Sequence, residues 1–156
     1  MRFSALIKTL ALIAAICAWE THAMATDGLI TIKSNFGPED TMKRLEAEVK
    51  AKGLTVFAHV DHAAGAAAVG MNLRPTDLII FGNAKGGTPL MQQVQTVGID
   101  LPLKALVWQD EAGITWLSYN DPAYLAGRHG VGDPAKAVVA ALTGALHAIA
   151  TKATTP

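Results

Sequence analysis

The chain has 156 residues, about the length of one domain. Hydrophobic residues make up 51% of it and charged residues 17%, and 13 basic residues balance 13 acidic ones, so the formal net charge is zero. There is one cysteine. These values exclude a disulfide framework, a strongly charged nucleic-acid-binding protein and a disordered chain.

Residues 1–25 have the pattern of a cleavable secretory signal. Arg2 and Lys8 give a positive start, residues 10–17 form an unbroken apolar run, and Ala23-Met24-Ala25 fits the small-x-small site of a signal peptidase. The run is shorter than the roughly 20 residues of a bilayer span, although a retained N-terminal anchor is the alternative. Lipidation of Cys17 is disfavoured because Ile16 is too large for the preceding position.

Cleavage would leave a chain of 131 residues with 11 basic and 12 acidic side chains. The cysteine would be lost, and with it disulfides, thiolate nucleophiles and cysteine metal ligands. No later apolar run is expected to reach membrane-spanning length. The predicted location is the periplasm or the medium, with one domain over residues 26–150.

Residues 28–33 form a β-branched run and predict a first strand. A helix is expected from Pro38, with an apolar stripe of Met42, Leu45 and Val49 and a left-handed cap at Gly53. Residues 54–60 predict a second strand, in which Leu54, Val56, Ala58 and Val60 share one face and Phe57 and His59 point the other way. Asp61 can cap a short alanine-rich helix over 62–69. The apolar run 78–81 predicts a strand inside a sheet.

In the second half, a loop enters a helix with Thr88 as its cap and Pro89 at its first position, running to about Val97. Residues 104–109 and 114–119 flank a short polar turn and predict a β-hairpin that carries Trp108 and Trp116. A helical turn is expected at 121–125 and a last helix from Asp133. Residues 151–156 are expected to be a disordered tail.

The element order is β-α-β-α-β-α-β-β-α, with a short helical turn before the last helix. A tight hairpin requires antiparallel pairing, so a purely parallel sheet is excluded. The prediction is a two-layer α+β domain with an antiparallel or mixed sheet and helices on one face.

Several local strings occur in an order that resembles the bacterial family of domain of unknown function 302. They are Val60-Asp61-His62-Ala63-Ala64, Leu73-Arg74-Pro75-Thr76, residues 81–91 (FGNAKGGTPLM), residues 100–104 (DLPLK), and Ser118-Tyr119-Asn120 with Arg128-His129-Gly130. The resemblance implies a curved antiparallel sheet with a long C-terminal helix, similar to the TATA-binding-protein arrangement. It implies no activity. Ala84 departs from the proline that the family usually has there.

The segment from Gly82 to Thr88 is the first candidate site. Its backbone amides, the dipole of the following helix and the Lys85 charge could hold a small anionic ligand. The spacing is not that of a nucleotide-binding P-loop, because Thr88 stands where the phosphate-binding lysine would be. The alternative is an ordinary strand-to-helix turn that binds no ligand. The candidate ligand residues here are Asn83, Lys85, Gly86, Gly87 and Thr88.

A second candidate comprises His59, Asp61 and His62, with His129 as a distant addition. His59 and Asp61 share a strand face about 7 Å apart, so a metal could bridge them. The spacing matches no standard zinc signature, and Asp61 as a helix cap needs no metal. A third candidate is Asp100 with Lys104, which could transfer a proton, form a solvated ion pair or anchor a loop.

The leading hypothesis is an exported binding or accessory domain that uses no cofactor and catalyses no reaction. One alternative is an enzyme using Asp61, His62, Lys85 or Asp100 in acid–base chemistry. Another is a module that forms homodimers through a sheet edge or face. Scattered, balanced charges predict no nucleic-acid partner.

Overall fold

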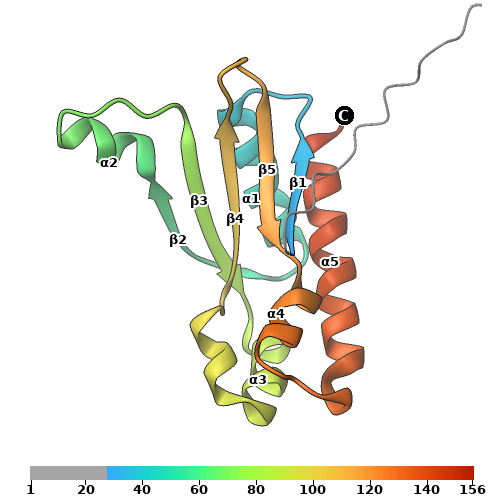
Figure 1. Cartoon of the computed structure of the whole chain (residues 1–156). Coiled ribbons are helices and arrows are strands. Elements are labelled where there is room, and N and C mark those ends of the chain that lie inside the picture. Colours follow the sequence, from blue (N-terminus) through green and yellow to red (C-terminus); the bar gives the residue numbers. More distant parts are fainter. Residues whose placement is uncertain (1–27) are drawn as a thin grey trace, which may run out of the picture.

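We describe residues 28–156 of a computed structural model, and the predicted signal segment therefore lies outside the described residues. Five antiparallel strands form one sheet in the order β1-β5-β4-β3-β2 (Figure 1). The strands are β1 (Leu29–Lys33), β2 (Thr55–Asp61), β3 (Thr76–Gly82), β4 (Leu103–Gln109) and β5 (Thr115–Asn120). The sheet is antiparallel throughout, which confirms the α+β prediction and removes its mixed-sheet option.

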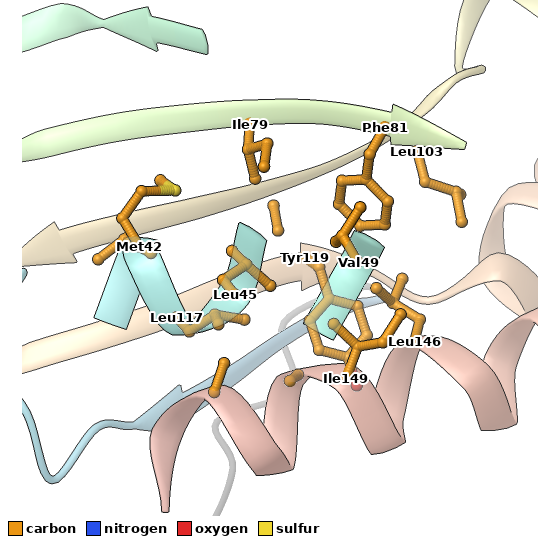
Figure 2. Packing of buried hydrophobic residues seen from close by; sticks show 14 of the residues in the cluster. Met42, Leu45, Val49, Ile79, Phe81, Leu103, Leu117, Tyr119, Leu146 and Ile149 are labelled. Atoms are coloured by element: carbon orange, nitrogen blue, oxygen red, sulfur yellow. The ribbon is translucent and has the colours of Figure 1, made fainter. Parts of the chain in front are cut away.

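Two long helices, α1 (Pro38–Ala51) and α5 (Lys136–Thr154), pack against each other and against one face of the sheet. The helix α1 begins with Pro38, and Gly53 follows it with a φ of +70°, as the sequence predicts. Met42, Leu45 and Val49 are buried on one stripe of α1. Figure 2 shows this stripe facing Leu117 and other side chains of the sheet.

The opposite face of the sheet has no helix layer in the described part of the chain. Trp108 and Trp116 lie directly opposite each other on the β4–β5 hairpin, with ring centroids 6.2 Å apart. Their indole nitrogens donate to Ser118 Oγ at 2.9 Å and to Asp110 Oδ2 at 2.8 Å. The predicted hairpin that carries these tryptophans is confirmed.

The edge strand β2 departs from the predicted alternation. A bulge between Val56 and Ala58 shifts its register against β3. Val56 lies opposite Phe81 and His59 opposite Ile79, so both belong to the helix-covered side. The simple alternation, in which Val56 and Val60 share a face, is therefore wrong beyond the bulge.

Two smaller helices lie at the end of the sheet where β3 ends and β4 begins (Figure 1). These are α3 (Ala84–Gln93) and α4 (Pro122–Arg128), and 3-10 turns follow them at Gln95–Ile99 and Asp133–Ala135. The remaining helix, α2 (His62–Ala68), is at the opposite end of the molecule beside β2. The two ends of the sheet thus carry different helices, α3 and α4 at one end and α2 at the other.

The start of α3 corrects the expected boundary. Its cap is Asn83, whose Oδ1 accepts the Gly86 amide at 2.8 Å, and Pro89 lies inside the helix. Asparagine is a strong N-cap, so it begins the helix five residues before Thr88. The helix ends at Gln93, not near Val97.

The C-terminal helix corrects two expectations. It continues to Thr154, and Ala153 and Thr154 are fully buried, so residues 151–154 are not a disordered tail. The stretch Asp133–Thr154 is also long and apolar enough to cross a bilayer by length and composition, contrary to the expectation from the sequence. One side of it packs into the core through Leu146, Ile149 and Ala150.

Candidate functional site

An apolar cavity of about 400 Å³ lies where α3 and α5 meet the end of the sheet. Seventeen residues line it, and Asn83 has the only polar side chain among them. The sheet contributes Phe81 and Leu103, which Figure 2 shows pointing toward Leu146 of α5. The cavity is therefore a continuation of the hydrophobic core that side chains do not fill.

Glycines account for much of the open space. Gly82, Gly86, Gly87 and Gly98 all line the cavity. A Cβ at Gly86 would lie 3.0 Å from Leu142 Cδ2, and one at Gly87 would lie 3.4 Å from Leu101 Cδ1. Helix α3 can thus approach Leu142 of α5 at Gly86, and Leu101 at Gly87, because it carries no side chain at these points.

The predicted Gly82–Thr88 segment lines this cavity, but it does not form the predicted anion cradle. Gly86 and Gly87 lie inside α3, and their amides already donate to Asn83 Oδ1 at 2.8 Å and Asn83 O at 3.2 Å. The side chains of Lys85 and Thr88 are exposed, and neither residue lines the cavity. The segment therefore offers the cavity glycine surface and one amide side chain.

Asp100 and Lys104 do not form the ion pair that their spacing suggests. Lys104 Nζ donates to the backbone oxygens of Asp100 and Pro102, both at 3.2 Å. The Asp100 carboxylate instead contacts His129 Nε2 at 2.7 Å and Arg128 Nη1 at 3.2 Å. These contacts tie the end of α4 to residues 100–102, and Leu101 and Pro102 of that segment line the cavity. Asp100 and Lys104 thus support a cavity wall.

The candidate metal ligands do not come together. His59 Nε2 lies 3.5 Å from Glu46 Oε2, and Asp61 Oδ1 accepts the Ala64 amide at 2.8 Å as the predicted cap of α2. His62 begins α2, whereas His129 is at the other end of the sheet with Asp100. Within residues 28–156 no group of three His, Cys, Asp or Glu side chains has metal-binding geometry.

One polar residue near α2, Asp77, was not among the candidate site residues that the sequence indicated. Asp77 lines an open groove of about 640 Å³ between α1 and the β2–α2 end of the molecule. Its Oδ1 is buried without a hydrogen-bond partner among the described residues, and burial raises the pKa of its carboxyl. Its position just before the apolar run 78–81 was the available signal, but that position is equally common for turn residues.

The chain forms a small α+β domain with an apolar cavity at one end of its sheet. The model of the family described as "Domain of unknown function DUF302" matches residues 30–149. The chain therefore belongs to this family, as the resemblance suggests. A crystal structure of an uncharacterized conserved protein DUF302 from Bacillus stearothermophilus has a similar fold, with a TM-score of 0.73 and 24% identity over 82% of this chain and 99% of that one.

Three curated relatives from Brucella species are 50% identical to this chain over 105 residues, which is 67% of its length. They are fluoride-specific ion channel FluC 1 of Brucella suis, FluC 1 of Brucella abortus and FluC 2 of Brucella melitensis. The matched region is 41% of the first and 39% of the other two. The chain thus spans about two fifths of the length of these relatives.

Proposed function

We propose that this domain binds a small molecule with an apolar body in the cavity between α3, α5 and the end of the sheet. The observation that carries the proposal is a cavity of about 400 Å³ whose lining has one polar side chain, Asn83. Ligand sites in proteins are typically concave, mostly apolar and roughly 300–1,000 Å³ in volume, with a few polar groups that orient the ligand. The cavity has these properties.

The lining chemistry selects the ligand class. An ion that enters this cavity would lose its hydration shell and find one amide side chain in exchange, which is strongly unfavourable. The cavity therefore suits neither a small anion of the kind predicted for the Gly82–Thr88 segment nor the fluoride in the names of the Brucella relatives. An aromatic or branched aliphatic group, with one hydrogen-bonding atom near Asn83, fits its lining.

The positions of the candidate acid–base residues support binding over catalysis. Asp61 and His62 are at the α2 end of the sheet, whereas Lys85 and Asp100 are at the α3 end. The carboxylates of Asp61 and Asp100 already have partners, respectively the backbone of α2 and the His129 ring. The two pairs are thus too far apart to act together on one substrate, because proton transfer requires hydrogen-bond distance.

The proposal is tested with the neutral fluorescent probe N-phenyl-1-naphthylamine. Ala145 lines the cavity from α5, and Ala141, one turn earlier on the same helix, is exposed. We expect the probe to bind the protein, Ala145→Phe to weaken binding about tenfold or more, and Ala141→Phe to leave it unchanged. The variant Ala145→Leu is a control for unfolding, and the melting temperature of each variant shows whether it is folded. Absence of probe binding, or equal loss in both Phe variants, contradicts the proposal.

We also propose that the domain acts in the periplasm or outside the cell. The basic start, the apolar run and the small-x-small site in residues 1–25 support this location. Mass spectrometry of the protein recovered after export should find a chain that begins after Ala25. A recovered chain that still begins at Met1 contradicts cleavage.

A further inference from the structure

Asn83 lines the cavity and at the same time caps α3, so its side chain has two tasks. Its Oδ1 atom accepts the Gly86 amide at 2.8 Å. Because only the oxygen of a side-chain amide can accept an N–H, the cap fixes which end of the Asn83 amide is the oxygen and which is the NH2 group. Among residues 28–156 this NH2 group makes no hydrogen bond, so both of its hydrogens are free to donate.

The cavity reaches the surface at Asn83 and at Phe57. Both residues line it and both are exposed, Phe57 to 57%. The inner lining includes Phe81 and Leu146, which are buried. A ligand that fills the cavity therefore has its apolar body against these buried side chains, and one of its ends can lie at the Asn83 amide.

Backbone oxygens beside the cavity already have donors. The Asn83 carbonyl accepts the Gly87 amide at 3.2 Å. Where the chain enters β4, the carbonyls of Asp100 and Pro102 accept from Lys104 Nζ, both at 3.2 Å. These oxygens are engaged, whereas the Asn83 NH2 group is free. The polar groups at this end of the cavity thus offer donors to a ligand more readily than acceptors.

The start of α3 strengthens this preference. Ala84 lines the cavity and is the first residue of the helix, so its amide has no acceptor within the helix. The positive end of the helix dipole also lies there, and it favours the partial negative charge of an oxygen atom. Among the described residues that line the cavity, none has a charged side chain. A carboxylate would therefore lose hydration without gaining a cation as partner, which disfavours it against a neutral oxygen.

We propose that the ligand of this cavity is a neutral carbonyl compound, with an aromatic or branched aliphatic body and a ketone, aldehyde or ester oxygen that accepts from the Asn83 NH2 group. Asn83 then determines which polar group the site accepts. A ligand without this oxygen would cover the NH2 group and leave it unpaired, and an amine would place a donor against a donor. This inference rests on the proposed function and adds the chemistry of the ligand's polar end.

Two ligands of nearly equal size isolate the hydrogen bond. 2-Acetylnaphthalene and 2-ethylnaphthalene differ by one carbonyl oxygen, and each is measured by its displacement of N-phenyl-1-naphthylamine. The variant Asn83→Asp keeps an oxygen that caps α3, because Asn and Asp are equally good N-caps, and it replaces the NH2 group with a second oxygen. The dissociation constant of the ethyl compound divided by that of the acetyl compound should fall about tenfold in Asn83→Asp.

The variant Thr88→Asp is the matched control for the added charge. Thr88 is an exposed residue of the same helix and does not line the cavity. This variant should leave the ratio of the two dissociation constants unchanged. The ratio compares two ligands on one protein, so a general loss of stability in Asn83→Asp cancels from it. 2-Naphthoate, which has the same ring and a charged end, should bind the wild type at least about tenfold more weakly than 2-acetylnaphthalene.

The outcomes separate this inference from the proposed function. A ratio that is the same in Asn83→Asp and in the wild type refutes the hydrogen bond to Asn83. Tighter binding of 2-naphthoate than of 2-acetylnaphthalene refutes the neutral ligand class. In either case, probe binding that Ala145→Phe weakens and Ala141→Phe does not leaves the cavity proposal intact. If the wild type binds none of the naphthalene compounds, the proposed function fails and this inference fails with it.

Discussion

Truncation of the chain after Ala150 is predicted to destabilise the domain strongly. The sequence suggests that residues 151–156 are dispensable, but Ala153 and Thr154 are fully buried. The Thr154 carbonyl accepts the Asn35 amide at 2.9 Å, which ties the segment between β1 and α1 to the end of α5. Arg44 donates to the carbonyls of Lys152 and Thr155 at 3.0 and 2.6 Å.

The size of the effect follows from these contacts. Each buried methyl group of Ala153 and Thr154 contributes about 0.8 kcal/mol. The hydrogen bond between Asn35 and Thr154 contributes about 1 kcal/mol, and the exposed Arg44 contacts add little. The expected loss is about 3 kcal/mol out of the roughly 5–15 kcal/mol that stabilise a domain. The melting temperature should fall by about 10 °C.

Urea denaturation of the full chain and of two truncated forms measures this loss. The control form ends at Thr154 and therefore lacks Thr155 and Pro156, which are both exposed. It should be within about 0.5 kcal/mol of the full chain. If the form that ends at Ala150 is as stable as the control, the C-terminal turn does not contribute to the core, and the argument from burial is wrong.

Three further predictions concern single side chains. Gly87→Ala should stabilise α3 by up to about 1 kcal/mol in thermal denaturation, because the added Cβ would make only ordinary contacts. Gly86→Ala should give a smaller gain in stability, because its Cβ would lie 3.0 Å from Leu142. Asp77→Asn should raise stability at pH 7, because the pKa of the buried carboxyl lies above its ordinary value of 3.8 and its ionisation opposes folding as pH rises through that window. Urea titrations should show the gain vanishing below about pH 4, and a gain independent of pH would contradict this reasoning. Tyr119→Phe should not lower stability, because the buried hydroxyl has no hydrogen-bond partner among residues 28–156. Burial also raises the pKa of this hydroxyl to about 12. A loss of more than about 1 kcal/mol in the Phe variant would show that the hydroxyl does have a hydrogen-bond partner.

The periodicity of apolar residues predicted most of the secondary structure. The stripe of Met42, Leu45 and Val49, the hairpin that carries Trp108 and Trp116, and the cap at Asp61 all depend on contacts within a few residues. Local patterns specify such features because the helix and strand periods fix which side chains share a face. The hairpin alone excluded a parallel sheet, and the family strings then agreed with the antiparallel domain.

The sequence also located one wall of the cavity, through the glycines of the segment 82–88, but it did not predict that the lining of the cavity is apolar. Whether Gly86 and Gly87 expose their amides depends on where α3 begins, and the choice between Asn83 and Thr88 as the cap is not visible in a local pattern. The sequence did not indicate that His129 is the partner of Asp100, because the two residues are 29 positions apart in the chain.

Local sequence thus determined most of the elements, their order and the exclusion of a purely parallel sheet, since each of these follows from short-range sterics and apolar spacing. The tertiary structure alone decided that Ala153 and Thr154 are core residues and that an apolar cavity opens beside Phe57. It also left most of residues 63–71 exposed to solvent. Burial is a property of what packs against a segment, and the packing partners here are far apart in the sequence.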